Sequence, residues 1–305
     1  MNAFSFRGTG VAIVTPFQDD LQVDYNQLGR LIEFNIEGGV EYIVSLGTTG
    51  EAVTLSSAEC RQVLDYTIRK VDGRVPIVAG FFGSNFTEMI TKKVQAYNFD
   101  GIAAIMSSSP AYVKPSQEGI FRHYMALAEA SPLPVILYNV PSRTGSNVLP
   151  ETVVRIAHET DKIVAVKEAS GDLNQAMKIL KHRPAHLQVL SGDDVLSLPM
   201  IAAGADGVIS VIANLYPRTF SDMVRACLSG DLETARRLNE ALLDVHPWLY
   251  VEGNPVGIKA AMEAKGLCPR SVRLPLCPMS DSNYAQLQKA LSKVDVEEVP
   301  ALAGL

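Results

Sequence analysis

The segment Ile163-Val-Ala-Val166 consists of four apolar residues, and the more polar sequence Lys167-Glu-Ala-Ser-Gly171 follows it directly. A strand with apolar side chains on both faces is typical of a parallel sheet covered by helices, because neither face then meets water. Similar runs recur at residues 11–14, 42–46, 75–79, 102–106, 135–138, 187–190 and 208–211. Together with residues 163–166 they predict eight parallel strands.

Helical patterns fill the intervals between these runs. Apolar residues at helical spacing share one face in two examples, namely Leu28, Leu31, Ile32 and Ile36, and Ile120, Phe121, Tyr124 and Leu127. Ser56-x-x-Glu59 is typical of a capping box that opens a helix, and Pro150 fits the first turn of another. Because parallel strands need such crossovers, the pattern predicts an α/β fold, a (β/α)8 TIM barrel.

No strand pattern follows Gly230, and residues 232–246, 256–264 and 284–291 are predicted as helices. We therefore expect a (β/α)8 catalytic barrel at residues 1–228 and a small helical C-terminal domain at residues 229–305. The pair Gly8-x-Gly10 lacks the third glycine of a dinucleotide-binding turn, which argues against a dinucleotide site.

Composition narrows the classes of partner. The chain has 305 residues, with 27 basic and 33 acidic side chains and a formal net charge of −6, which argues against a nucleic acid or an anionic membrane as partner. No secretory signal is recognised at the start, so we expect a cytoplasmic protein.

The chain has four cysteines, Cys60, Cys227, Cys268 and Cys277. They form no C-x-x-C pair, so neither a zinc site nor a disulfide framework is expected.

In a barrel of this kind the catalytic groups lie at the carboxyl ends of the strands. The chain places polar sequences there after several strands: Gly47-Thr-Thr-Gly-Glu51, Ser107-Ser-Ser-Pro-Ala-Tyr112, Tyr138-Asn-Val-Pro-Ser-Arg-Thr-Gly145, Lys167-Glu-Ala-Ser-Gly171 and Ser191-Gly-Asp-Asp194. We expect the active site among them.

Lys167 is the most informative of these residues. It directly follows four apolar strand residues, so its amine is expected to be partly desolvated, and desolvation lowers the pKa of an amine. A neutral amine is a nucleophile suited to Schiff-base chemistry. The same pattern also fits a lysine that extends out of the barrel mouth or pairs with a carboxylate.

Other residues at this edge have a functional and an ordinary interpretation. Tyr138 could relay protons near an imine, or it could be a rim tyrosine with a satisfied hydroxyl. The turn Gly47–Gly50 could bind a carboxylate through its amides and hydroxyls, or it could be a plain glycine turn. Arg143 suits a carboxylate but also fits a solvated loop. Asp193 and Asp194 could suggest a metal, but capping of the next helix is the simpler prediction.

The four marks Gly47-Thr-Thr-Gly-Glu51, Tyr138 to Gly145, Val166-Lys-Glu-Ala-Ser-Gly171 and Ser191-Gly-Asp-Asp194 together resemble the dihydrodipicolinate synthase / N-acetylneuraminate lyase superfamily of class I aldolase barrels. The resemblance covers nearly the whole chain. Within the superfamily, the double threonine and the arginine after the fifth strand are similar to the synthase branch.

The resemblance implies a mechanism at Lys167, whose amine forms an imine with the ketone of pyruvate. Thr48 and Thr49 are implied to bind the pyruvate carboxylate, and Tyr138 to move protons. Thr48 also links Tyr138 to Tyr112, which in the family comes from the neighbouring subunit across a tight-dimer interface.

The second half of the implied reaction uses L-aspartate-4-semialdehyde, whose carboxylate meets Arg143. The product is 4-hydroxy-tetrahydrodipicolinate, at the first committed step of diaminopimelate and lysine biosynthesis. Ile209 lines the site in related enzymes, and Gly47 belongs to the substrate-binding turn. The resemblance implies that no metal and no organic cofactor is needed, since the imine is the electron sink. It also implies a homotetramer built as a dimer of tight dimers.

Regulated family members bind lysine at the tight-dimer interface. This chain departs from their pattern, because Ala111 replaces an aromatic residue and Ser57 and Cys60 replace histidines. Asn85 and Glu88 are candidates for retained positions, but the spacing around Phe81-Phe82 differs by one residue. Our hypothesis is that lysine inhibits weakly or not at all.

Two other functions stay open. The same imine could serve a lyase of sialic acids or 2-keto-3-deoxy sugar acids, although Arg143 and the two threonines do not resemble a hydroxyl-rich sugar site. A barrel of this kind could also be a non-catalytic sensor of keto acids.

Overall fold

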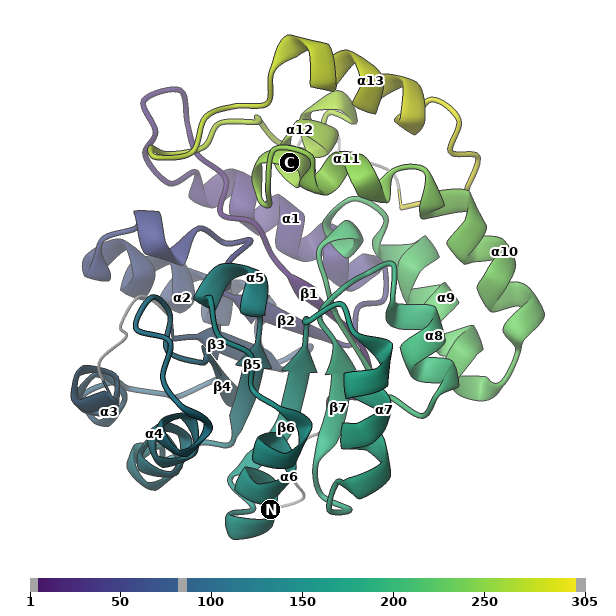
Figure 1. The fold of residues 1–305 in the computed structure, drawn as a ribbon. Coiled ribbons are helices and arrows are strands. Elements are labelled where there is room, and N and C mark those ends of the chain that lie inside the picture. The colour runs from purple at the N-terminus through teal and green to yellow at the C-terminus, as the bar shows by residue number, and fades with distance from the viewer. Residues whose placement is uncertain (1–4, 82–86, 300–305) are drawn as a thin grey trace.

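The computed structural model describes residues 5–81 and 87–299, and their strands form one closed barrel in the order β1 to β8. All neighbouring strands are parallel, and β1 closes the barrel against β8 (Figure 1). The predicted TIM barrel is confirmed. The strands are β1 (Gly8–Ala12), β2 (Tyr42–Ser45), β3 (Ile77–Gly80), β4 (Ala104–Ser108), β5 (Val135–Asn139), β6 (Ile163–Glu168), β7 (Gln188–Ser191) and β8 (Gly207–Ser210).

The strand ends differ slightly from the predicted ranges. The third strand was expected from residue 75, but β3 begins at Ile77, directly after Pro76. Proline has no amide hydrogen for the ladder, so the regular strand starts behind it.

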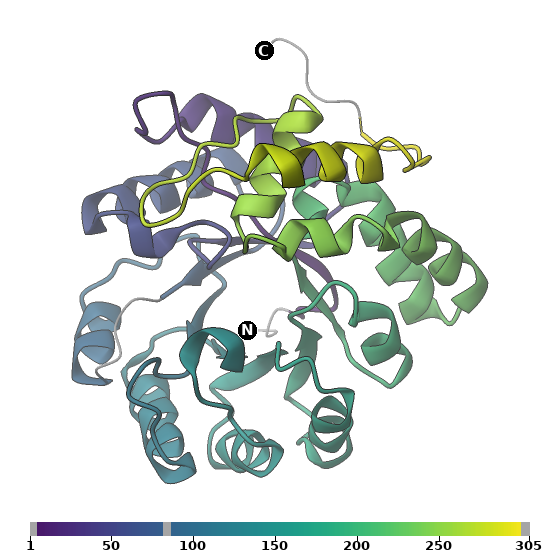
Figure 2. The ribbon, with the colours of Figure 1, turned by 45° about the horizontal axis from the view of Figure 1, so that its top comes forward.

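Helices form an outer ring around the strands in both ribbon views (Figure 2). Around the barrel they are α1 (Tyr25–Glu37), α2 (Ser57–Val71), α3 (Thr87–Gln95), α4 (Gln117–Ala130), α5 (Pro141–Thr144), α6 (Pro150–Glu159), α7 (Leu173–His182), α8 (Ser197–Ala202) and α9 (Pro217–Ser229), with short 3₁₀ turns η1 (Ala52–Thr54) and η2 (Ile212–Asn214). The predicted capping box of Ser56 and Glu59 opens α2, and Pro150 begins α6.

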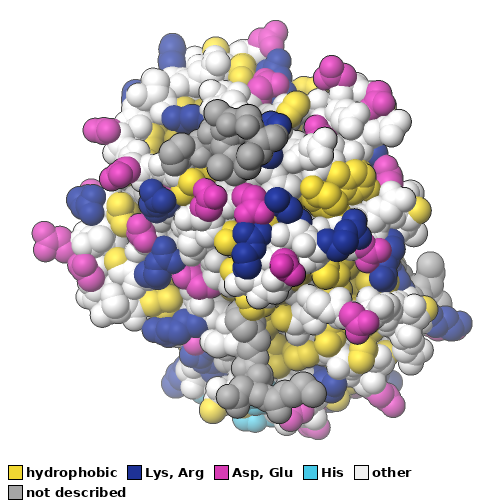
Figure 3. Space-filling view, turned by 180° about the vertical axis from the view of Figure 1, so that it is seen from behind, with side chains coloured by type: hydrophobic (Ala, Val, Ile, Leu, Met, Phe, Trp, Pro, Cys, Tyr) yellow, Lys and Arg dark blue, Asp and Glu magenta, His cyan; other side chains and the backbone are white. Residues whose placement is uncertain are grey.

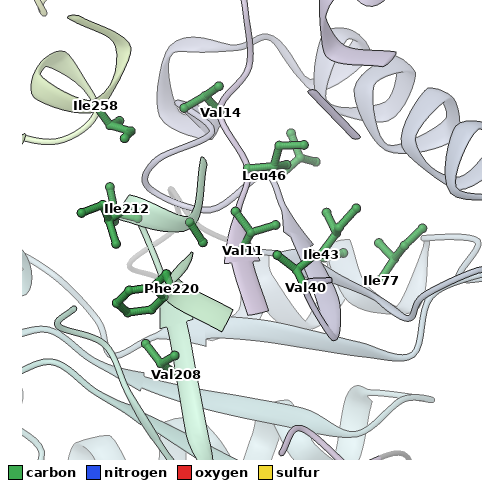
Figure 4. Close-up of a cluster of buried hydrophobic side chains, with 14 of the residues drawn as sticks. Val11, Val14, Val40, Ile43, Leu46, Ile77, Val208, Ile212, Phe220 and Ile258 are labelled. Atoms are coloured by element: carbon green, nitrogen blue, oxygen red, sulfur yellow. The ribbon is translucent and has the colours of Figure 1, made fainter. Parts of the chain in front are cut away.

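Two apolar layers explain why the strand sequences do not alternate with polar residues. Alternate strand residues, such as Val44, Val78 and Ile136, fill the inside of the barrel. Their neighbours, such as Ile43 and Val208, belong to an outer layer that packs against the helices, of which Figure 4 shows a part. Both faces are therefore buried, as expected for a parallel barrel.

The C-terminal helices are α10 (Leu232–Leu243), α11 (His246–Tyr250), α12 (Val256–Ala264) and α13 (Asp281–Leu291). The single helix expected over residues 232–246 is wrong, because α10 ends at Leu243 and α11 begins at His246. Pro247 lies in the first turn of α11, where proline is favoured. Inside one continuous helix the same proline would be unfavourable, because it lacks an amide hydrogen and clashes with the preceding turn. The division into domains at residues 228 and 229 stays a proposal.

Charged side chains of both signs are interspersed on the face seen in Figure 3, with small apolar patches between them. Within residues 5–81 and 87–299 no helix is long and apolar enough to cross a membrane.

Candidate active site

A cavity of about 740 Å³ opens at the carboxyl ends of the strands. Side chains from the ends of β5 and β6 line it, together with the turn after β2, the loop after β7 and residues of α10 and α11. Of the eight residues expected in the site, six line this cavity: Gly47, Thr48, Thr49, Tyr138, Arg143 and Lys167.

Lys167 is the fifth residue of β6, and its side chain is buried, with 5% exposed. Burial lowers the pKa of its amine to about 8; Asp194 opposes this change and Arg143 adds to it. The described residues provide no ion-pair partner within 4.0 Å, so the carboxylate-paired interpretation does not apply. At pH 7 about one such amine in ten is neutral, which suits a nucleophile.

Gly192 explains how the loop after β7 can cover this lysine. A Cβ at Gly192 would lie 2.6 Å from the Cβ of Ala169 and 3.1 Å from the Cε of Lys167. A side chain at this position would therefore displace the lysine, and only glycine lets the loop approach so closely.

Tyr138 stands beside the lysine because β5 and β6 pair these two residues in register. The Nζ of Lys167 lies 4.4 Å from the centroid of the Tyr138 ring. Burial raises the pKa of the phenol, while Arg143 and a hydrogen bond with the Thr48 side chain act in the opposite direction. The pair of an amine and a hydrogen-bonded phenol can move a proton at an imine.

Tertiary contacts hold the turn after β2 in place. The hydroxyl of Thr15 donates to the carbonyl of Gly50 over 2.7 Å. Lys259 from α12 forms an ion pair with Glu51, and both side chains are almost fully buried. Glu51 adopts a left-handed backbone conformation with φ of 53°, which these contacts stabilise.

Asn254 joins the two expected carboxylate-binding residues. Its amide nitrogen donates to the hydroxyl of Thr49 over 3.0 Å, and its backbone carbonyl accepts from the Arg143 guanidinium, also over 3.0 Å. It lines the cavity as well. The sequence analysis did not identify Asn254, although a polar residue between glycine and proline before a helix was a usable signal.

Asp193 and Asp194, which follow β7, do not cap the next helix as predicted. The next helix, α8, begins only at Ser197. Asp194 instead accepts hydrogen bonds from the amides of Val211 (3.0 Å) and Ile212 (2.8 Å), so it caps the turn η2 after β8. Asp193 accepts from the amide of Val195 over 3.1 Å and lines the cavity.

Two expected residues do not line the cavity. Ile209 is buried inside the barrel, in the apolar cluster that contains Tyr138. Tyr112 is 89% exposed and has a left-handed backbone with φ of 69°, held by a hydrogen bond from its amide to the carbonyl of Thr144. Within one chain, the structure does not bring Tyr112 into the cavity.

Further cavity residues come from the C-terminal helices and were not anticipated: His246 and Tyr250 on α11, and Asp244 just before it. A lone histidine at the start of a short helix carries no sequence signal that points to a barrel mouth. Among the described residues, no cluster of three or more His, Cys, Asp and Glu side chains could hold a metal ion.

Comparison with known proteins agrees with this geometry. The model of the dihydrodipicolinate synthetase family matches residues 5–294. The chain is 44% identical over 297 residues to the 4-hydroxy-tetrahydrodipicolinate synthase of Parabacteroides distasonis, covering 97% of this chain and 100% of the relative. It is 47% identical over 284 residues to the enzyme of Geobacter sulfurreducens, covering 92% and 96%.

Among solved structures, it is similar to the dihydrodipicolinate synthase of Acinetobacter baumannii in complex with pyruvate. The TM-score is 0.91 at 40% identity, and the match covers 95% of this chain and 99% of the other.

Proposed function

The chain belongs to the dihydrodipicolinate synthetase family, and on this premise we propose that it condenses pyruvate with L-aspartate-4-semialdehyde to give 4-hydroxy-tetrahydrodipicolinate. This is a lyase reaction of diaminopimelate and lysine biosynthesis. The observation that carries the proposal is the buried amine of Lys167 beside Tyr138, at the mouth of a barrel whose full-length relatives have this activity.

In the first step the neutral amine of Lys167 attacks the ketone carbon of pyruvate. The hydroxyl group of the resulting carbinolamine leaves as water, and a protonated imine remains. Tyr138 supplies the proton for this water, and its hydrogen bond with Thr48 lets the phenol be reprotonated. The turn of Gly47, Thr48 and Thr49 is proposed to bind the carboxylate of pyruvate through its amides and hydroxyls.

In the second step the Tyr138 relay accepts a proton from the methyl carbon of the imine, which becomes an enamine. This carbon attacks the aldehyde carbon of the second substrate, and the aldehyde oxygen becomes a hydroxyl group. Arg143 is proposed to bind the carboxylate of this substrate, since its guanidinium lines the cavity and Asn254 holds it in place. The amino group then replaces the Lys167 nitrogen at the imine carbon, which frees the enzyme.

Family enzymes use the lysine imine with pyruvate, and we propose that this chain needs no metal or organic cofactor, because the protonated imine accepts the electron pair. We also propose that Ile209 contributes to the site from inside the barrel, and that the protein acts in the cytoplasm.

The exposed position of Tyr112 supports a shared site. We propose a homotetramer, a dimer of tight dimers, in which Tyr112 of one subunit completes the proton relay of its neighbour. The side chain of Tyr112 is almost fully exposed, and a hydrogen bond holds its backbone in place. Such a tyrosine is suited to insertion into a neighbouring subunit.

Borohydride trapping tests the proposal. Pyruvate and borohydride are expected to add one reduced pyruvyl group per chain to the wild-type protein and none to Lys167→Ala, measured by intact mass. A coupled assay then compares L-aspartate-4-semialdehyde with sugar-derived aldehydes. Absence of the adduct, or turnover of sugar aldehydes alone, would contradict the proposed function.

A further inference from the structure

The two neighbouring aspartates after β7 have different surroundings. Asp194 is only 1% exposed, and amides of Val211 and Ile212 donate to its carboxylate. Asp193 is partly exposed and lines the cavity. Asp194 is therefore a structural cap, while the carboxylate of Asp193 remains accessible from the cavity.

Asp193 is also firmly positioned. Its amide donates to the hydroxyl of Ser191 (3.3 Å), and its carbonyl accepts from the hydroxyls of Ser191 (2.7 Å) and Ser197 (3.0 Å). Its carboxylate accepts from the amide of Val195, and the part of the chain that the structure describes offers it no basic partner within 4.0 Å. The preceding residue, Gly192, packs against Lys167, and Asp193 lines the same cavity as the reacting amine.

His246 is a second, independent sign that this wall of the cavity meets a polar group. It is 1% exposed, it lines the same cavity, and neither of its ring nitrogens has a hydrogen-bond partner among the described residues. Burial lowers the pKa of its imidazole, while the charges of Asp194 and Asp193 act in the opposite direction. A buried imidazole without partners is costly unless a ligand or water satisfies it.

The second substrate of the proposed reaction is zwitterionic, with an ammonium and a carboxylate on the same carbon. If Arg143 binds the carboxylate, the ammonium needs an acceptor in the same partly desolvated cavity. Among the described lining residues the carboxylates are those of Asp193 and Asp244, and Asp244 is exposed at the rim.

We propose that Asp193 binds the α-ammonium of the amino-acid aldehyde and accepts its proton before transimination, with His246 completing this polar wall. The inference rests on the proposed function and specifies how that site selects an amino acid. One proton passes from the ammonium to the carboxylate. The freed lone pair forms the new bond to the imine carbon. A proton then moves from the attacking nitrogen to the Lys167 nitrogen, the bond from that carbon to Lys167 breaks, and the lysine leaves as a neutral amine while a cyclic protonated imine remains.

The test compares L-aspartate-4-semialdehyde with succinic semialdehyde, which has the same carboxylate and aldehyde but no amino group. For Asp193→Asn we expect kcat/KM with the amino-acid aldehyde to fall roughly 10- to 100-fold, as for loss of a hydrogen bond between charged groups. The inhibition constant of succinic semialdehyde should change less than about threefold, because that ligand does not use the contact. Asp193→Glu, which keeps a carboxylate, should retain part of the discrimination.

Asp244→Asn is the matched control, since it removes the same charge at the cavity rim. The inference would be overturned if Asp193→Asn weakened the use of the amino-acid aldehyde and the binding of succinic semialdehyde equally, or changed neither. It would also be overturned if Asp244→Asn lowered kcat/KM for the amino-acid aldehyde as much as Asp193→Asn does. Pyruvate trapping on Lys167 shows that each variant is folded, and Asp193→Ser gives the same comparison if Asp193→Asn loses trapping. Failure of wild-type trapping would instead contradict the proposed function itself.

Discussion

At the scale of single residues, the reactivity of the site comes from the surroundings of one amine. Lys167 is held in the barrel mouth by its strand, Gly192 leaves room for its side chain, and burial rather than a charged neighbour is the main cause of its lowered pKa. Desolvation makes the neutral, nucleophilic form of the amine accessible near neutral pH.

The pH dependence of imine formation follows from this pKa. Because the reacting form is the neutral amine and the pKa is about 8, the neutral fraction rises as pH increases through 8. The initial rate of borohydride-trapped adduct should increase nearly tenfold per unit below pH 7 and level off above about pH 9. A rate that keeps rising towards pH 10.5 would show an amine that is not desolvated.

Tyr138 provides a second prediction at this scale. Tyr138→Phe keeps the ring beside Lys167 and removes only the hydroxyl, so the fold should be preserved. The turnover number should fall about 10²- to 10⁴-fold, the usual contribution of a general acid–base group. Steady-state assays measure the loss, and an unchanged thermal midpoint serves as control. Turnover within threefold of the wild type would exclude the phenol from the relay.

At the scale of elements, the segment that leads into α12 connects the C-terminal helices to the barrel mouth. Asn254 bonds both Thr49 and Arg143, and Lys259 pairs with Glu51 and donates to the carbonyl of Ser271. Residues about 200 positions apart in the chain thus determine the shape of one turn.

Removing one partner of the buried pair leaves an unpaired buried charge. We expect Lys259→Met to destabilise the protein by about 3–5 kcal/mol, and Glu51→Gln combined with Lys259→Met to cost less than the sum of the single changes. Urea titration measures both. The exposed pair Lys92–Glu88 is the control, since Lys92→Met should cost less than about 1 kcal/mol. Equal losses at the two sites would refute the buried-pair argument.

At the scale of the whole molecule, one chain does not bring every residue of the proposed relay into its cavity. The cavity holds Lys167, Tyr138 and Thr48, while Tyr112 is exposed, as are the nearby Val113 and, after β2, Val53. An assembly that covers these residues would complete the site and bury the apolar surface.

Complementation between two defective chains checks this assembly. Tyr112→Phe and Lys167→Ala should each have little activity alone. In mixed tight dimers, one site combines the intact Lys167 of one chain with the intact Tyr112 of the other. Co-expression should restore about a quarter of wild-type activity, because half of random dimers are mixed and half of their sites are complete. If no activity returns in mixed dimers confirmed by mass spectrometry, Tyr112 does not act across the interface.

The effect of lysine is also a property of the assembly. Cys60 is half-buried with its thiol directed to the carbonyl of Ala52, Ser57 is exposed at the start of α2, and Asn85 lies outside the described residues. With no histidine at positions 57 and 60 and no aromatic residue at 111, we expect no inhibition by lysine below millimolar concentration in a steady-state assay. A sub-millimolar inhibition constant would contradict this expectation.

The barrel could be predicted from the sequence, because eight runs that are apolar on both faces are best buried as parallel strands under helices. It also singled out Lys167 and Tyr138, since each follows an apolar run and parallel strands end at a common edge. These inferences need only local patterns and one topological rule.

Which polar residues contact one another became known from the folded structure. It separated the roles of Asp193 and Asp194, brought Asn254 between Thr49 and Arg143, placed His246 on the cavity wall, and left Tyr112 on the surface. The physical reason is that these contacts join segments far apart in the chain, whose hydrogen bonds and buried charges depend on how strands and helices pack. No local periodicity encodes such pairings.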